Sequence, residues 1–368
     1  MRLSGFIQEK NNNFNLLRFI AASAVLLGHS FALLRQPEPL GQSLGMSIGA
    51  IAVDLFFITS GFLVTGSLLA RQSAVDYVLA RVLRIYPALI VMLVLTVFGL
   101  GAFFTSLPPG AYFRHAETYS YFLKCSALLG DIAYFLPGVF DGNPYKGAVN
   151  GSLWSMVFEI KMYMLLLLFW LVSGLKSSLK SGNQAKRFGY LVIASALLAG
   201  TLVLGRRFYG FEENSEDGLF IRFGFMFSSG AAFWVLKQRI SLSFRVFAGF
   251  CIGLIVSALV GKQAFFVAYQ FSIAYILFYL AFVPAGLIRK FNAYGDNSYG
   301  IYIYAFPIQQ SLIALLPGIS VALLTILAFP LSLCFARASW YLVEQPALNL
   351  KKLLSARMQR GDVPGMPV

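Results

Sequence analysis

The sequence predicts an all-α, polytopic membrane protein. Of its 368 residues, 58% are hydrophobic and only 12% are charged, and the mean hydropathy is +0.73. A soluble domain of this length would need far more charge on its surface. The apolar residues form continuous runs and do not alternate with polar ones, which favours spanning helices over a membrane β-barrel.

Ten apolar runs of about 20 residues each are expected to be the membrane spans. They cover residues 15–34, 49–69, 85–106, 152–173, 188–205, 218–236, 246–261, 265–288, 299–316 and 319–341. The first run is too long for a signal-peptide core and lacks a small-residue cleavage site, so it is predicted to be a helix. Residues 1–348 are therefore expected to form one membrane domain, followed by a basic, disordered tail at 349–368.

The distribution of charge predicts that both termini are cytoplasmic. Residues 121–140 are fairly apolar but contain Lys124, Asp131 and Pro137. Counting them as a span would turn the basic loop at 176–187 outward and the acidic loop at 212–217 inward, against the positive-inside rule. We therefore expect 121–140 to be an outer-face or re-entrant element.

Charge and cysteine content exclude several classes of partner. The net charge of +14 comes from basic residues spread over short loops, which is typical of membrane topology. The predicted partner is therefore the lipid bilayer, and no nucleic-acid partner is expected. Cys125, Cys251 and Cys334 are isolated and show neither disulfide nor metal-ligand spacing. His29 and His115 are far apart in the sequence, so no metal site is predicted. The sequence indicates no oligomeric state.

His29 is the first candidate for chemistry, because an imidazole inside a spanning helix usually has a function. Proton transfer, ligand binding and metal ligation are the common ones, and a histidine satisfied between helices is the alternative. Asp54 lies early in the second run, and in a hairpin of the two runs both side chains are expected at similar depth. A His29–Asp54 pair would fix the imidazole tautomer, or would serve only as an ion pair that holds the hairpin.

Glu159 opens the fourth run and is a second candidate acid. It could orient His29 or pair with Lys161 or Arg222. Nearby aromatic residues, such as Trp154 and Tyr163, could equally be interface anchors.

Arginines mark the cytoplasmic edge of two runs. Arg81 and Arg84 are spaced i, i+3 and share a helix face, so they can clamp an anion or simply mark the membrane border. Arg18 lies at the same level of the first run. Together the three favour a basic mouth for a phosphate-bearing donor.

Two further patterns are predicted to concern packing. Ser60-Gly61-Phe62 allows close helix approach or a bend. Tyr299, Tyr302 and Tyr304, in the run interrupted by Pro307, are expected to form a packing stripe.

Taken in order, the motifs resemble those of the acyltransferase-3 family of integral membrane O-acyltransferases, over roughly residues 13–348. They are Leu17-Arg18 with His29, Val53-Asp54-Leu55-Phe56-Phe57 with Ser60-Gly61-Phe62, Arg81 with Arg84-Ile85-Tyr86-Pro87, Ser152-Leu153-Trp154-Ser155 with Glu159 and Tyr163, Asn297-Ser298-Tyr299-Gly300-Ile301-Tyr302, and Glu344-Gln345-Pro346. Two positions depart from the family pattern: Ile160 stands where a second acid is common, and Ala305 where a histidine is common.

The resemblance implies a ten-helix domain that transfers an acyl group, commonly acetyl, from acetyl-CoA or another acyl-CoA. The implied acceptor is a hydroxyl of a cell-surface or lipid-linked glycan, and the implied location is the bacterial inner membrane. Arg18 and His29 match the family's essential pair, and Arg81 and Arg84 match the pair linked to donor use. A further set of residues is expected to support substrate binding or the structure of the site: Trp154, Ser155, Tyr163, Tyr299, Tyr302 and Glu344. Any periplasmic partner is expected to be a separate chain.

We therefore predict acyl transfer with His29, Asp54 and Glu159 as catalytic residues. His29 would be the general base on the hydroxyl or would carry the acyl group, and Asp54 or Glu159 would orient it. The main alternative is a proton-coupled transporter or flippase of a lipid-linked sugar, with His29 and Asp54 as relay. Such transporters often have repeated halves, and the sequence shows no internal repeat. A membrane scaffold is a third possibility.

Overall fold

The computed structural model describes residues 1–8, 11–175, 181–212 and 214–350. Within these ranges the chain is helical and contains only isolated β-bridges, with no strand. It divides into two compact units, each built from two separate stretches of sequence. Unit 1 comprises Met1–Leu69 and Trp154–Asp296, and unit 2 comprises Ala70–Leu153 and Asn297–Val368.

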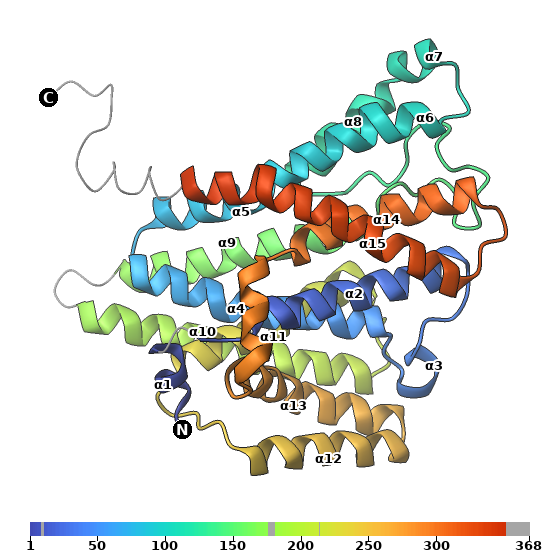
Figure 1. Cartoon of the computed structure of the whole chain (residues 1–368). Coiled ribbons are helices and arrows are strands. Elements are labelled where there is room, and N and C mark those ends of the chain that lie inside the picture. Colours follow the sequence, from blue (N-terminus) through green and yellow to red (C-terminus); the bar gives the residue numbers. More distant parts are fainter. Residues whose placement is uncertain (9–10, 176–180, 213, 351–368) are drawn as a thin grey trace, which may run out of the picture. The chain divides into compact units, whose positions relative to one another are not determined.

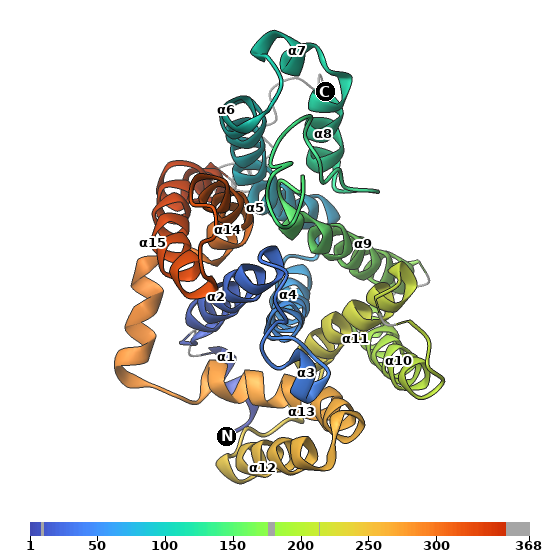
Figure 2. The same ribbon diagram turned by 90° about the vertical axis from the view of Figure 1, so that its right-hand side faces the viewer.

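Unit 1 is a bundle of long helices. In Figures 1 and 2, α2 and α4 lie side by side, with the short α3 in the connection between them. The helix pairs α10 and α11, and α12 and α13, also pack together. The elements are α1 (Leu3–Gln8), α2 (Phe14–Leu33), α3 (Gly41–Leu44), α4 (Ile48–Arg71), α9 (Trp154–Gly174), α10 (Ser181–Phe208), α11 (Glu216–Val235), α12 (Phe244–Val260), α13 (Lys262–Phe282) and the 3-10 helix η3 (Gly286–Tyr294).

Unit 2 contains three long helices and several short ones, and α14 and α15 pack against each other. Two of its elements are π-helical turns that continue α5 and α15. The elements are α5 (Ala74–Val94), the π-helix η1 (Leu95–Gly101), α6 (Ala102–Phe104), α7 (Pro109–Arg114), α8 (Ala116–Ala127), the 3-10 helix η2 (Gly151–Leu153), α14 (Ser298–Leu315), α15 (Val321–Ser339) and the π-helix η4 (Trp340–Glu344).

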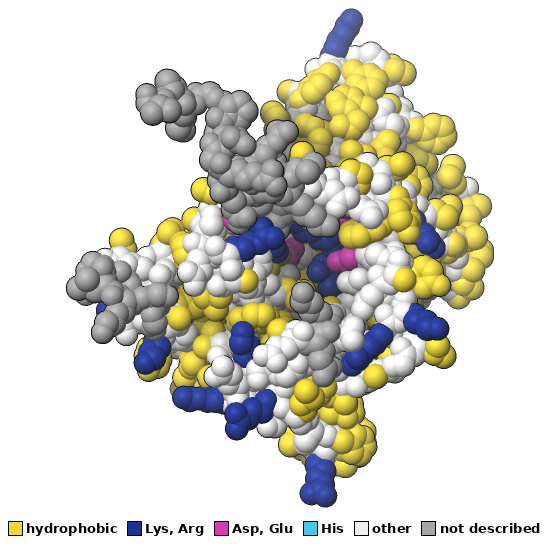
Figure 3. All heavy atoms as spheres, turned by 60° about the vertical axis from the view of Figure 1, so that its left-hand side comes forward, with side chains coloured by type: hydrophobic (Ala, Val, Ile, Leu, Met, Phe, Trp, Pro, Cys, Tyr) yellow, Lys and Arg dark blue, Asp and Glu magenta, His cyan; other side chains and the backbone are white. Residues whose placement is uncertain are grey.

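The predicted fold class is confirmed: the chain is an all-helical, polytopic membrane protein. Eight helices of the described residues are long and apolar enough to cross a bilayer. The remaining two expected spans coincide with α12, of 17 residues, and α14, of 18 residues. Figure 3 shows hydrophobic side chains over much of the surface, with many Lys and Arg and few Asp and Glu side chains on the face drawn. The number of crossings and the side of each terminus stay predictions.

Some predicted boundaries are wrong. The third span was expected at 85–106, but its helix begins at Ala74 because Ser73 caps it, accepting a hydrogen bond from the Asp76 backbone N–H. Arg81 and Arg84 therefore lie well inside a helix. The eighth span ends at Phe282, six residues early, just before Pro284. Of the predicted tail, residues 351–368 lie outside the described part of the chain.

The ambiguous segment 121–140 forms no spanning helix. Its helix α8 has 12 residues, about 18 Å of rise, which is too short for a bilayer. Residues 128–150 are irregular, and amide side chains tie them to α14. Pro307 has no N–H for the carbonyl of Ile303, and the Asn150 side chain donates to that carbonyl instead at 2.9 Å. The placement of segment 121–140 at the outer face, or as a re-entrant element, remains a prediction.

Small residues let α4 and α11 cross closely, as Ser60-Gly61-Phe62 predicted. A Cβ at Gly61 would lie 1.9 Å from the carbonyl oxygen of Phe227, and one at Gly230 would lie 2.0 Å from that of Ile58. Only glycine fits at either position. This crossing fixes the helices that carry Asp54 and Arg222.

Candidate active site

Asp54 of unit 1 is fully buried, with no exposed surface. Its Oδ1 accepts from Nε of Arg222 at 3.0 Å, and its Oδ2 accepts from Nη2 of Arg222 at 2.8 Å. The hydroxyl of Tyr269 also donates to Oδ2, at 2.9 Å. A buried carboxylate needs such donors to offset its lost hydration. The three residues join α4, α11 and α13.

Gly28 and Gly49 set the register of the α2–α4 hairpin, and the shared depth of His29 and Asp54 stays a prediction. Gly28 lies beside Gly49, since a Cβ at Gly28 would be 3.4 Å from the Gly49 backbone nitrogen. Asp54 is five residues further along α4, about 7.5 Å of helical rise. The end of α2 therefore meets the start of α4 in this hairpin. The hydrogen bonds of Asp54 go to Arg222 and Tyr269, and neither pairing was predicted from the sequence.

Glu159 forms a second polar cluster in unit 1. Its Oε1 accepts hydrogen bonds from the Ser60 hydroxyl, at 2.9 Å, and from the Tyr163 hydroxyl. Lys161, one of its suggested partners, pairs instead with Glu216 at 2.8 Å. Glu159 thus has two hydroxyl neighbours that can orient it or relay a proton.

Three further predicted residues of unit 1 have contacts of their own. Ser155 is buried, and the Trp154 ring packs against Phe223 with 5.6 Å between ring centroids. Arg18 forms a looser ion pair with Asp296, 3.5 Å between Nη1 and Oδ2, and its guanidinium lies over the Phe56 ring.

Unit 2 holds Arg84 in an aromatic cage with a buried acid. Nη1 of Arg84 lies 3.0 Å from Oε2 of Glu344, whose side chain is 1% exposed. The Ser339 hydroxyl donates to the other carboxylate oxygen at 3.1 Å. The guanidinium faces the rings of Tyr299 and Trp340, at 5.6 and 5.9 Å from the centroids. The π-helical turn at the end of α15 brings Glu344 into this position.

The other predicted residues of unit 2 are also on its helices. Arg81 lies one turn before Arg84 on α5. The hydroxyl of Tyr299 donates to the carbonyl of Ile85 at 2.9 Å, which fixes α14 against α5. Tyr299, Tyr302 and Tyr304 are all at most 9% exposed, as a packing stripe requires.

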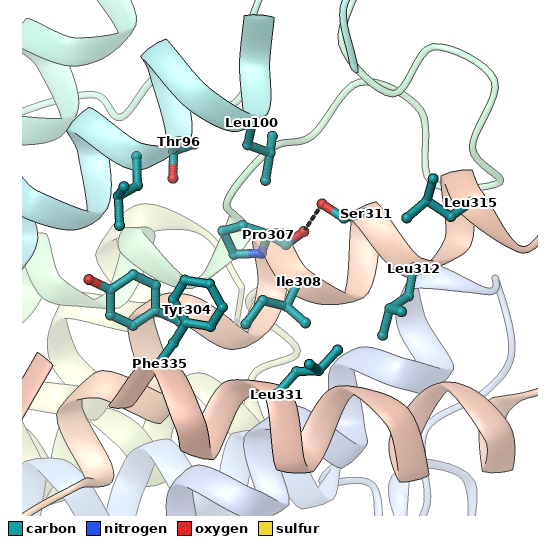
Figure 4. A pocket seen from close by; sticks show the side chains of 11 residues that line it. Thr96, Leu100, Tyr304, Pro307, Ile308, Ser311, Leu312, Leu315, Leu331 and Phe335 are labelled. Atoms are coloured by element: carbon teal, nitrogen blue, oxygen red, sulfur yellow. Dashed lines mark hydrogen bonds between the residues drawn. The ribbon is translucent and has the colours of Figure 1, made fainter. Parts of the chain in front are cut away.

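A cavity of about 370 Å³ lies in unit 2 between η1, α14 and α15 (Figure 4). Its polar lining consists of the hydroxyls of Thr96, Tyr304 and Ser311, and the last donates to the carbonyl of Pro307 at 2.8 Å. None of the predicted site residues lines it. Its walls suit hydrocarbon and contain no acid or base.

Cys125 lies in α8 and is buried. Burial raises the pKa of the Cys125 thiol to about 12, which keeps it protonated and unreactive at neutral pH. Its Sγ donates to the carbonyl of Ala133. In the described ranges, no three His, Cys, Asp or Glu side chains are grouped to hold a metal ion.

Comparison with known proteins gives the family. The model of the acyltransferase domain matches residues 11–343. The chain belongs to the acyltransferase-3 family. This family member is 28% identical over 366 residues to the O-acetyl transferase of Shigella phage Sf6, covering 93% of the chain and 97% of that relative. It is also 28% identical over 370 residues to nodulation protein 10 of Rhizobium leguminosarum bv. viciae, covering 94% and 95%. No solved structure matches this acyltransferase.

Several residues of the clusters were missed or misassigned from the sequence. Arg222 stands out as an ionisable residue within a span, but its partner depends on how α4 and α11 cross. Tyr269 is one of 18 tyrosines and carries no signal of its own. Asp296 directly precedes the Asn297-Ser298-Tyr299 motif, and that position could have identified it as a partner for a predicted arginine.

Proposed function

We propose that the chain transfers an acyl group, in the first instance acetyl, from acyl-CoA to a hydroxyl of a cell-surface or lipid-linked glycan at the bacterial inner membrane. Membership of the acyltransferase family over residues 11–343 carries this proposal. The relative described as an O-acetyl transferase supports an oxygen acceptor. Transport without acyl transfer is the less favoured reading, because the Asp54 of the expected relay is engaged with Arg222 and Tyr269.

In the proposed reaction, the acceptor oxygen attacks the thioester carbonyl, the C–S bond breaks, and the CoA thiolate leaves. His29 takes the proton from the hydroxyl and returns it to the thiolate, so no net proton is consumed. Alternatively, His29 carries the acyl group between the two substrates. Glu159 and its hydroxyl neighbours Ser60 and Tyr163 supply a second polar group in the same unit.

The arginines are the proposed ligands of the donor phosphates. Arg18 forms an ion pair of 3.5 Å with Asp296, which is longer than the 3.0 Å pair of Arg84 with Glu344. Arg84 is held more firmly, since Glu344 and two rings surround it. For unit 1, we therefore propose Arg18 as the ligand of a donor phosphate. For unit 2, we propose that Arg84 contributes positive charge while it fixes α5 to η4, and Arg81 stays a predicted ligand.

Radiolabelled acetyl-CoA supplied to membranes that contain the chain tests this function. We expect label to appear as an alkali-labile ester in the glycan fraction, and not in membranes without the chain. Movement of glycan with no esterification would support a transporter. Absence of both activities would contradict an enzyme acting on glycans.

A further inference from the structure

The connection between α2 and α4, residues 34–47, has a constrained backbone. Arg35 and Leu40 adopt positive φ angles of 56° and 68°, a conformation that costs energy for residues other than glycine. Such residues cluster where a segment must hold one particular shape for a ligand. Glu38 lies between them.

Glu38 turns one carboxylate oxygen into the α2–α4 hairpin. Its Oε2 lies 3.0 Å from where a Cβ at Gly28 would be and 3.3 Å from the corresponding position at Gly49. The absence of side chains at these two glycines is what admits the carboxylate. The residue as a whole is only half-buried, so Glu38 extends from the surface to the helix position directly before His29.

The oxygen that points inward is buried and, within the described part of the chain, has no hydrogen-bond donor. Buried polar atoms are nearly always paired, and each exception calls for an explanation. Two other acids of unit 1 show the contrast, since Asp54 has three donor groups and Glu159 has two. A carboxylate can only accept hydrogen bonds, so a hydroxyl group is a chemically suitable partner.

We propose that Glu38 accepts a hydrogen bond from a hydroxyl of the acceptor glycan and thereby holds the acceptor at the His29 end of α2. This inference rests on the proposed acyl transfer and adds a residue of the acceptor site. A polyhydroxylated sugar offers donors next to the one that is acylated. Hydrogen bonds to a charged acceptor are stronger than neutral ones, which lets one carboxylate contribute measurably to acceptor affinity.

The test uses full-length protein in membranes, labelled acetyl-CoA, and the glycan fraction that the wild-type chain acetylates. Glu38→Met removes the acceptor atoms at similar length, and Glu38→Gln keeps one neutral acceptor oxygen. We expect E38M to raise the half-saturating amount of glycan by at least about tenfold, with E38Q in between and the half-saturating acetyl-CoA concentration unchanged. Glu212→Gln, an exposed acid of the α10–α11 loop, should behave as wild type.

Each other outcome is decisive. Wild-type glycan dependence in E38M overturns the proposal, and so does a fall in the maximal rate at unchanged half-saturation, which would place Glu38 with His29. Equal weakening for glycan and acetyl-CoA, with a lower unfolding temperature, indicates a structural role and also overturns it. If E38M does not fold, E38Q with Glu38→Asp provides the same comparison. Lack of label transfer by the wild type refutes the proposed function itself.

Discussion

Asp54 and Glu216 are both paired acids of unit 1, but they differ in burial. Asp54 is fully buried and bonded to Arg222, whose side chain is 15% exposed, whereas Glu216 is 73% exposed and paired with Lys161. Breaking a buried pair leaves an uncompensated charge, while an exposed pair is replaced by water. The buried pair should therefore dominate the electrostatic contribution to stability.

Asp54→Asn should destabilise the protein by about 3 kcal/mol, because it leaves the Arg222 guanidinium buried without a counter-ion. The free energy of unfolding from denaturant titration in detergent micelles measures this. Glu216→Gln is the matched control and should leave the titration midpoint nearly unchanged. Equal midpoints for D54N and wild type would show that the pair does not hold α4, α11 and α13 together.

At the residue level, the sequence could predict which side chains are unusual but not which of them meet. A charge inside an apolar run is visible in the sequence, so Asp54 and Glu159 could be selected, and the i, i+3 spacing with Arg81 selected Arg84. Their partners depend on how the helices cross, as the pairing of Asp54 with Arg222 shows. Glu38 could not be found at all, because it lies in a connection and only the packing of Gly28 and Gly49 shows where its oxygen points.

The α4–α11 crossing is the clearest case of packing at the level of helices. Gly61 and Gly230 each face a backbone carbonyl of the other helix, at distances that leave no room for a methyl group. The helices can therefore approach closely enough for Arg222 to reach Asp54. Close packing of this kind is a main source of association between helices in lipid, where no hydrophobic driving force acts between them.

Gly61→Ala should destabilise the protein by about 1–3 kcal/mol, because the new methyl group must push α11 away. Gly253→Ala in α12 is the control, since a Cβ there meets nothing within 4 Å, and alanine favours a helix over glycine by up to about 1 kcal/mol. Thermal unfolding in detergent measures both. A G61A midpoint as high as that of G253A would contradict the close crossing.

For the whole molecule, hydropathy predicted the helices well, and every expected span coincides with a helix. Boundaries moved where capping and proline act, as at Ser73 and Pro284. The irregular residues 128–150 were beyond prediction, because amide side chains such as Asn143 and Asn150 fix them to α14 through contacts far apart in the sequence. The division into two units could not be foreseen either, since each unit joins separate stretches.

The predicted topology places the α4–α5 connection inside the cell and the α10–α11 loop outside. In a chain whose three native cysteines are replaced, Gln72→Cys should react with a membrane-impermeant maleimide only after permeabilisation, and Glu212→Cys should react in intact cells. Both positions are exposed, so reactivity reports the side of the membrane. Labelling of Q72C in intact cells would invert the topology and move the basic mouth to the outer side.

The most direct test of the account is the transfer of labelled acetyl to glycan by His29→Ala, compared with His115→Ala at equal amounts of folded protein in the membrane. His115 is the other histidine of the chain and is 45% exposed. Loss of a general base or acyl carrier should lower transfer by at least about 100-fold in H29A, while H115A keeps the wild-type rate. Transfer by H29A at the wild-type rate would contradict the assignment of His29 to the reaction.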